Sequence, residues 1–287
     1  MSTLDISSTE PASSVKNAVA AVRDHLEREV IGQTHLVKRM LMGLLCGGHI
    51  LVEGAPGLAK TRAIKALATV IEGDFHRIQF TPDLLPSDVT GTEIYRPEDG
   101  SFNFQPGPIF HNLILADEIN RAPAKVQSAL LEAMAERQVS FGRQTFTLPE
   151  LFMVMATQNP IEQEGTYALP EAQLDRFLLH ARVDYPDRQA ETDILRLVRD
   201  EAAGLGVPVG TCGTLISQAQ ILAARKEILS LHMTEPVERY MVELVLATRT
   251  PPAVLAPLIE LGSSPRGTIA LDLCARANAW LDDRDFV

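Results

Sequence analysis

Residues 50–62 read ILVEGAPGLAKTR, and this stretch decides the fold. Residues 49–53 form a short apolar run, typical of a buried strand, which breaks into a loop that contains glycine. From residue 61 to residue 71 the apolar spacing becomes helical. We therefore expect a strand, a loop and a helix in that order, which is the setting that a phosphate-binding loop requires.

The loop itself offers the groups that hold phosphates. Glycine lets the backbone approach a ligand closely, and the amino end of the following helix adds positive potential. Lys60 is placed to reach β- and γ-phosphates, and the Thr61 hydroxyl to hold Mg²⁺. Ala59 stands where a glycine usually precedes the lysine, so a tight turn with a solvated lysine is the alternative interpretation. The predicted nucleotide-binding residues of this stretch are Gly54, Ala55, Pro56, Gly57, Leu58, Ala59, Lys60, Thr61 and Arg62.

A second apolar run, residues 113–116, ends in two carboxylates. A buried strand of this kind delivers charge to the crevice at the carboxyl edge of a parallel sheet. We expect Asp117 to hold Mg²⁺ through water and Glu118 to polarise the attacking water. Taken alone, this Asp-Glu pair could simply mark the start of an exposed loop. The predicted phosphate loop earlier in the chain argues against that alternative.

Two further polar residues are candidates for the stabilisation of charge during phosphoryl transfer. The apolar run at residues 151–156 leads directly into Thr-Gln-Asn-Pro, which would place Asn159 beside the γ-phosphate to orient water. A plain Asn-Pro turn is the alternative. Arg176 is the second candidate, as a cation near the γ-phosphate.

The spacing of apolar residues predicts the structure of the rest of the chain. Two helical patterns precede residue 49, and short apolar runs at residues 75–80, 113–116, 151–156 and 177–183 indicate a covered parallel sheet. Turn-forming residues 97–100 predict a hairpin over residues 92–105, and a second one is expected over residues 139–148. The predicted organisation is a disordered tail at residues 1–14, an α/β domain at 15–185 and a smaller helical domain at 186–287.

Composition limits the partners of this chain. Its 287 residues are 46% hydrophobic, enough for a sizeable core, and its formal charge of -11 argues against binding of nucleic acid or an anionic membrane surface. The longest apolar stretch, residues 40–52, is interrupted by glycines, so no membrane span is expected. The three cysteines, Cys46, Cys212 and Cys274, show no metal or disulfide spacing, which favours a reducing, cytoplasmic location.

Four segments together resemble the MoxR family of AAA+ ATPases: residues 54–61, 116–123, 156–164 and 171–177. The likeness extends over roughly residues 15–285 and includes Ala59, which is usual in that family. It implies an AAA+ sheet flanked by helices and followed by a helical lid, with ATP and Mg²⁺ as ligands. Members usually continue past the position of Val287, so the resemblance also leads us to expect an incomplete lid.

The resemblance assigns roles to several residues. Residues 30–33, with Ile31 and Gly32, are similar to the segment that borders adenine. Asn159 is similar to sensor 1, Arg176 to the arginine finger offered to a neighbouring subunit, and Arg266 to sensor 2. A first-turn helix arginine facing solvent is the alternative for Arg266. The hairpin at residues 92–105 is similar to the helix 2 insert, which faces the pore of a ring.

The activity implied by this resemblance is ATP hydrolysis by a hexameric ring that remodels or assembles a protein client. A protein with a von Willebrand factor A domain is the expected partner. Two alternatives stay open: an ATP-sensing assembly module with little hydrolysis, and a metal-chelatase-type motor subunit or enhancer-type transcription activator. No helix-turn-helix or basic recognition helix is visible, which weakens the activator alternative.

Overall fold

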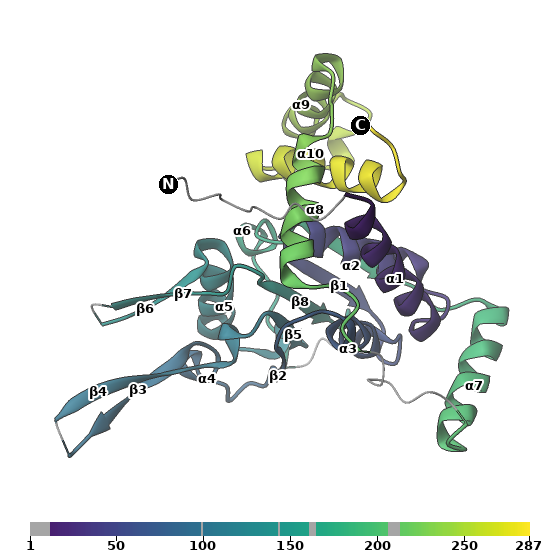
Figure 1. Ribbon diagram of the computed structural model, residues 1–287. Coiled ribbons are helices and arrows are strands. Elements are labelled where there is room, and N and C mark those ends of the chain that lie inside the picture. Colours follow the sequence, from purple (N-terminus) through teal and green to yellow (C-terminus); the bar gives the residue numbers. More distant parts are fainter. Residues whose placement is uncertain (1–11, 99, 143, 161–164, 206–212) are drawn as a thin grey trace, which may run out of the picture.

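The computed structural model describes residues 12–98, 100–142, 144–160, 165–205 and 213–287 (Figure 1). Most of the expected N-terminal tail, residues 1–11, lies outside the described residues. Helix α1 begins at Ala12, earlier than the expected boundary at residue 15. No helix within the described ranges is long and apolar enough to cross a membrane.

A parallel sheet of five strands forms the centre of the molecule, as predicted (Figure 1). Its order is β2-β5-β8-β1-β9, so β8 lies between β1 and β5. Helices lie on both faces, which is the expected cover of a parallel sheet. The strands are β1 (Ile50–Gly54), β2 (Phe75–Gln79), β5 (Leu113–Asp117), β8 (Met153–Gln158) and β9 (Leu179–Val183).

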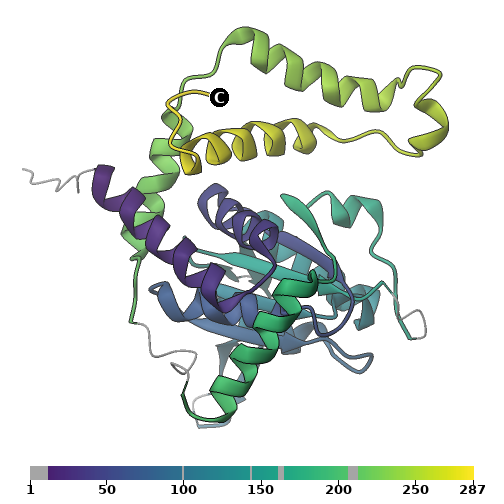
Figure 2. The same cartoon turned by 90° about the vertical axis from the view of Figure 1, so that its right-hand side faces the viewer.

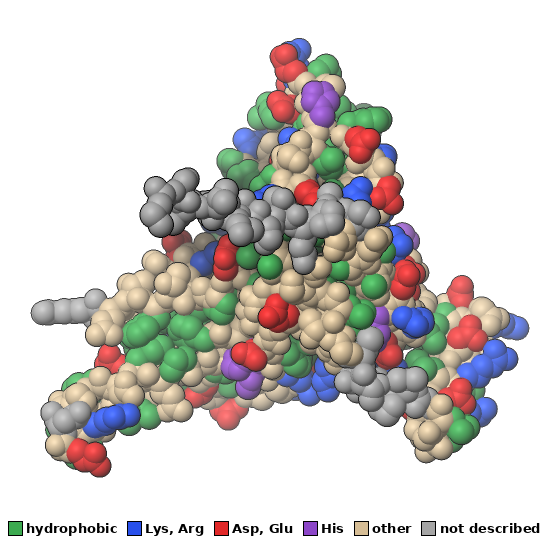
Figure 3. Space-filling view, viewed as in Figure 1, with side chains coloured by type: hydrophobic (Ala, Val, Ile, Leu, Met, Phe, Trp, Pro, Cys, Tyr) green, Lys and Arg blue, Asp and Glu red, His purple; other side chains and the backbone are tan. Residues whose placement is uncertain are grey.

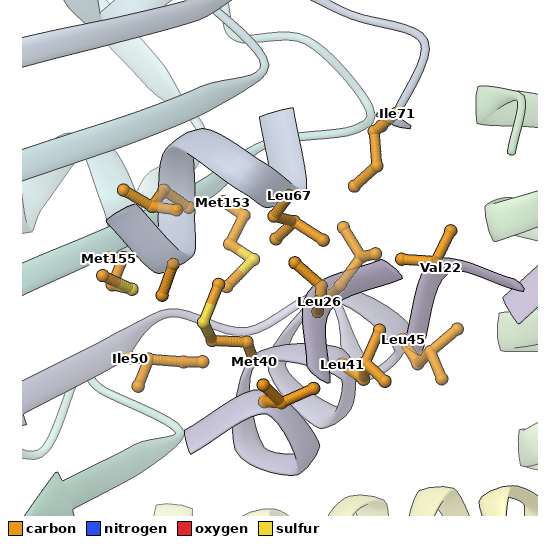
Figure 4. Packing of buried hydrophobic residues seen from close by; sticks show 14 of the residues in the cluster. Val22, Leu26, Met40, Leu41, Leu45, Ile50, Leu67, Ile71, Met153 and Met155 are labelled. Atoms are coloured by element: carbon orange, nitrogen blue, oxygen red, sulfur yellow. The ribbon is translucent and has the colours of Figure 1, made fainter. Parts of the chain in front are cut away.

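Alternate residues of each strand supply two apolar layers, because side chains of a strand point to opposite faces. Leu113 and Leu115 pack into the layer under the N-terminal helices, whereas Ile114 and Ala116 pack into the opposite layer. Figure 4 shows side chains from helices and sheet directed into the first layer. The helices around the sheet are α1 (Ala12–Glu29), α2 (Thr34–Cys46), α3 (Lys60–Val70), α4 (Pro86–Thr90), α5 (Ala124–Glu136) and α6 (Glu171–Leu174), with short 3-10 turns η1 (Pro108–Phe110) and η2 (Ile119–Arg121).

Both predicted hairpins are present, formed by β3 (Gly91–Arg96) with β4 (Ser101–Pro106) and by β6 (Gln138–Phe141) with β7 (Gln144–Thr147). The first hairpin closes tightly at its base, where a Cβ on Gly91 would lie 2.4 Å from the carbonyl oxygen of Gln105. Phe104 stacks on Phe146 of the second hairpin, with ring centroids 4.1 Å apart. Hydrophobic side chains therefore gather between the two hairpins (Figure 3).

All described elements after β9 are helical: α7 (Arg188–Ala202), α8 (Gln218–Ser230), α9 (Glu235–Arg249), η3 (Ala256–Leu258) and α10 (Pro265–Leu281). Helix α8 packs against α1, α2 and α10, and so joins the core to the last helices. The α9–α10 pair stands above the sheet, whereas α7 lies at another side of the core (Figures 1 and 2). The domain boundary at residue 185 stays a prediction.

His49, at the entrance to β1, is a buried neutral histidine. Its Nδ1 accepts the backbone N–H of Val154 at 3.0 Å, and its Nε2 lies 3.3 Å from the carbonyl oxygen of Met134. The tautomer with hydrogen on Nε2 satisfies both contacts. Burial lowers the pKa of His49 to about 4, against the opposing effect of the Met134 hydrogen bond.

Because the pKa of His49 is lowered in the folded protein, we expect the folded state to lose stability in acid. The unfolded chain, with a histidine pKa of about 6.5, binds more protons than the folded chain between that value and about 4. The free energy of unfolding should therefore fall by roughly 3 kcal/mol from this group as the pH drops through that window. Denaturant unfolding from pH 7 to pH 4 checks this against His49→Asn, whose Oδ1 can still accept from Val154. If the free energy of unfolding changed with pH equally in the wild type and in His49→Asn, the prediction would be wrong.

Candidate nucleotide-binding site

The predicted phosphate loop lies between β1 and α3, in the expected order of strand, loop and helix. A Cβ on Gly54 would lie 2.8 Å from the carbonyl oxygen of Val183, so only glycine fits where the strand enters the loop. Gly57 has φ +81°, and α3 begins at Lys60. The Lys60 ammonium donates to the carbonyl oxygens of Gly54 at 2.6 Å and Gln158 at 3.4 Å. The lysine therefore spans from the loop to β8, and the Thr61 hydroxyl follows in the first turn of α3.

Ala59, the departure from the usual glycine, has left-handed backbone with φ 56° and ψ 13°. A left-handed alanine costs about 1–2 kcal/mol, whereas glycine there costs about 0.4–1 kcal/mol in additional unfolded-chain entropy. We expect Ala59→Gly to leave stability unchanged or raise it by up to about 1 kcal/mol. Ala59→Val should destabilise, because a β-branched side chain tolerates this conformation poorly. Denaturant midpoints measure the stability of both variants. A clearly destabilised Ala59→Gly variant would show that the Ala59 backbone is not strained.

A cavity of about 350 Å³ adjoins the loop. Pro56, Gly57, Leu58 and Ala59 form one wall. Of the two residues expected to border the adenine, Ile31 lines this cavity and Gly32 does not: a Cβ on Gly32 would lie 2.7 Å from the Cβ of Ala190 in α7. The rest of the lining combines the polar residues Glu29, Gln33, Arg62 and Glu191 with an apolar set that suits a planar base: Ile31, Tyr185, Pro186, Ile194, Leu197 and Val198.

Arg62 borders the same cavity but is already engaged by two carboxylates. Its guanidinium contacts Glu29 of α1 at 2.8 Å and Glu201 of α7 at 2.6 Å. The Glu201 hydrogen bond raises the pKa of Arg62, and the same bond lowers the pKa of Glu201. Arg62 thus links α1, α3 and α7 around the cavity.

Asp117 lies at the carboxyl end of β5 and is buried. Its Oδ1 accepts the Thr157 hydroxyl at 2.6 Å, and its Oδ2 accepts from the Arg77 guanidinium at 2.6 Å. Sequence reasoning missed both partners. The signal for Arg77 was the polar alternation of Arg77 and Gln79 in β2, which places both side chains on one face of the strand.

Glu118 follows with left-handed backbone, φ 57°. Its N–H donates to the Thr157 hydroxyl at 2.9 Å, while its carboxylate accepts from Gln79 at 3.1 Å and contacts Arg121 at 3.0 Å. Thr157 of β8 therefore contacts both predicted acidic residues, Asp117 through its carboxylate and Glu118 through its backbone N–H. Asn159, just beyond β8, is buried at the same sheet edge.

Strand order explains why these residues meet. The register pairs Glu53 of β1 with Gln158 of β8, and Ala116 of β5 with Ala156 of β8. Because the strands are parallel, their carboxyl ends lie along one edge. The phosphate loop, Asn159 and the two acidic residues follow these adjacent strands, so the fold brings them together.

Arg176 and Arg266 lie elsewhere, in a second cleft of about 1070 Å³ between the sheet and α10. The residues that line this cleft include none of those that line the cavity beside the phosphate loop. Arg266 contacts Asp175 at 3.5 Å, and Asp175 also accepts the Ser264 hydroxyl at 2.6 Å. Among the described residues, the Nε of Arg176 is a buried side-chain atom without a hydrogen-bond partner.

The donor set at the sheet edge suits Mg²⁺. A carboxylate and a hydroxyl oxygen are the hard ligands that this ion prefers, with water completing its shell. Asp117 at the end of β5 and Thr61 in the first turn of α3, which packs against β5, would supply these two groups. Bound there, the ion would neutralise phosphate charge.

Comparisons with known proteins show the family of this chain. A family model described as ATPase family associated with various cellular activities (AAA) matches residues 49–179, and one described as AAA lid domain matches residues 253–287. Protein YeaC of Bacillus subtilis is 46% identical over 264 residues, covering 92% of this chain and 79% of YeaC. Chaperone MoxR1 of Mycobacterium tuberculosis is 45% identical over 266 residues, covering 91% of this chain and 69% of MoxR1.

A solved structure supports the same relationship. The crystal structure of a proposed ATPase from Cytophaga hutchinsonii superposes with a TM-score of 0.84 and 45% sequence identity, covering 95% of this chain and 82% of that chain. The predicted fold, a parallel AAA+ sheet with a helical lid, is therefore confirmed. Since the sequence likeness extends over nearly the whole chain, this protein belongs to the MoxR family of AAA+ ATPases.

Proposed function

We propose that this protein hydrolyses ATP and uses the reaction to remodel or assemble a partner protein. The observation that carries the proposal is the sheet edge, where the phosphate loop, Asp117, Glu118 and Asn159 follow adjacent parallel strands. In such an arrangement one site can hold a triphosphate and a water together.

In this proposal the loop amides and Lys60 bind the phosphates, and the base occupies the apolar cavity beside Ile31. Thr61 and Asp117 hold Mg²⁺, Asp117 through water. Asn159 orients the attacking water, and Glu118 accepts a proton from it as the water oxygen attacks the γ-phosphorus. The bond from that phosphorus to the β,γ-bridging oxygen breaks, and ADP and phosphate are released. Lys60 must leave the carbonyl oxygen of Gly54 to reach phosphate, since it contacts that atom at 2.6 Å here.

Arg176 and Arg266 act on the nucleotide of a neighbouring subunit in a ring, expected to be hexameric. Two observations support this arrangement: both line the cleft away from the chain's own phosphate loop, and the buried Nε of Arg176 lacks a partner among the described residues. A guanidinium supplied by a neighbour stabilises the charge of the transition state. Each site is then complete only when two subunits meet.

The partner in this proposal is a protein with a von Willebrand factor A domain. The relative from Mycobacterium tuberculosis is named a chaperone, which supports work on a protein client. The first hairpin also presents exposed apolar side chains, Ile94, Tyr95 and Phe102, suited to contact with a client. Co-purification with the von Willebrand factor A protein encoded nearest to this chain tests the pairing, and recovery of nucleic acid alone would overturn it.

Steady-state phosphate release by the purified chain, with Mg²⁺ and ATP, tests the proposed hydrolysis. Turnover that requires Mg²⁺ and disappears in Lys60→Ala supports it. A folded chain that binds ATP in calorimetry but releases no phosphate, alone or with its partner, would overturn hydrolysis and leave the ATP-sensing module as the function.

A further inference from the structure

Two cysteines far apart in the sequence meet where the core contacts the lid. Cys46 is the last residue of α2, and Cys274 lies in α10. The Cys46 thiol can donate to the carbonyl oxygen of Leu273, 3.4 Å away, or to the neighbouring thiol of Cys274, because its single hydrogen serves one acceptor at a time. Since α2 packs directly on α10, the two cysteines lie where the core contacts the lid helix.

The pair is held in place by its surroundings. Arg225 of α8 donates to the carbonyl oxygen of Leu44, near the end of α2, at 2.8 Å. Gly47, with φ 65°, ends α2 immediately after Cys46. The end of α2 that carries Cys46 is therefore fixed by α8 while Cys274 approaches from α10.

One member of the pair lies beside a solvent-filled cleft. Both cysteines are only partly buried, and Cys46 lines the cleft of about 1070 Å³ that contains Arg176 and Arg266, together with Leu273, the neighbour of Cys274. The hydrogen bond from Cys46 lowers the pKa of Cys274, while the same bond and burial raise the pKa of Cys46. Cys274 thus gains thiolate character, the reactive form of a cysteine, beside a second thiol that can resolve its oxidation.

We propose that Cys46 and Cys274 form a reversible disulfide when the protein meets a peroxide, joining lid helix α10 to core helix α2. The Cys274 thiolate attacks one oxygen of hydrogen peroxide, the O–O bond breaks, and sulfenic acid and hydroxide result; the proton that the Cys274 thiol released converts this hydroxide to water. The Cys46 sulfur then attacks the Cys274 sulfur, and the departing hydroxide takes the Cys46 proton as water. Two thiols are oxidised, and one peroxide is reduced to two waters.

The disulfide has a consequence for activity that depends on the proposed function. Arg266 and Cys274 lie on the same helix, so a bond at Cys274 restricts the movement of Arg266 relative to the core. If lid movement accompanies each cycle of hydrolysis, the cross-link slows turnover. Reduction of the bond restores it, which makes the pair a redox control on the ATPase.

The chemical test uses the full chain with Cys212→Ser, because Cys212 lies outside the described residues and could form other pairs. The protein is treated with hydrogen peroxide, alkylated with iodoacetamide under denaturing conditions, and analysed by intact mass and peptide mapping. We expect a product two hydrogens lighter, with a peptide linked between positions 46 and 274 and no alkylation at either. Sulfinic acid at either position, disulfide only between chains, or two alkylated thiols would overturn the proposal.

The physical test measures the oxidised and reduced forms by thermal unfolding. A bond that closes so long a loop should raise Tm by roughly 5–10 °C, and dithiothreitol should reverse the rise. Cys46→Ser and Cys274→Ser, each in the Cys212→Ser background, serve as matched controls that peroxide should leave unchanged. An oxidised protein with unchanged or lowered Tm would refute the joining of lid and core.

The activity test compares ATP turnover of the same samples. We expect oxidation to slow turnover several-fold, with recovery in dithiothreitol and no effect in the two serine variants. Unchanged turnover in a cross-linked, otherwise active protein would overturn the control of activity. Absent turnover in the reduced protein would count against the proposed hydrolysis. The mass and Tm measurements would still show whether the disulfide forms and joins the lid to the core.

Discussion

Glu118→Gln is expected to lower ATP turnover by roughly 10²–10⁴-fold while ATP still binds. The substitution removes the carboxylate that accepts the proton of water, but glutamine has the same shape and can still accept from Gln79, as Glu118 does at 3.1 Å. The phosphate loop and Asp117 are untouched, so affinity for ATP with Mg²⁺ should change little. Phosphate release and calorimetric binding of a non-hydrolysable ATP analogue measure the two properties separately.

A matched variant distinguishes this effect from a general loss of charge. Glu136→Gln makes the same chemical change at an exposed position at the end of α5 and should keep wild-type turnover. Wild-type turnover in Glu118→Gln would remove Glu118 from its role as the base. Equal losses in both variants would point to an effect of net charge instead.

Arg176→Ala is expected to lose turnover by roughly 10³–10⁵-fold alone, and to recover part of it when mixed with Glu118→Gln. In a mixed ring some sites combine an intact Glu118 from one subunit with an intact Arg176 from its neighbour. In a ring of equal and random composition about a quarter of the sites would do so, because adjacent subunits share each site. Phosphate release is followed as a function of mixing ratio, after subunits have exchanged.

The mixing experiment has a direct contrary outcome. If the mixture is as inactive as its two components although the subunits demonstrably exchange, Arg176 does not act across an interface. Arg239→Ala, which removes an exposed arginine paired with Glu235 on α9, is the control and should leave turnover intact. A loss in this control would indicate a general sensitivity to removal of surface arginines.

Local pattern was sufficient to predict most of the fold. The alternation of apolar residues in the strands, the turn at residues 97–100 and the glycine loop before Lys60 each encode their own local structure. All five predicted strands and both hairpins are present for that reason. Gly54 is an example at the site: its lack of a side chain, visible in the sequence, is what allows the Val183 carbonyl to approach.

Contacts between distant segments could not be predicted in this way. Arg77 and Thr157 hold Asp117, yet neither follows a motif, because their roles depend on the parallel register of β2, β5 and β8. The pairing of Arg62 with Glu201 and the meeting of Cys46 with Cys274 likewise depend on how α7 and α10 pack.

The sequence by itself determined the loop between β1 and α3, the acidic end of β5 and the family, since each depends on residues that are adjacent along the chain. The binding of phosphate by that loop stays a prediction. Only the tertiary structure decided that Arg176 and Arg266 share a cleft separate from the loop. The physical reason is that a side chain's neighbours across the fold are set by strand order and helix packing, which arise from burial summed over the whole chain.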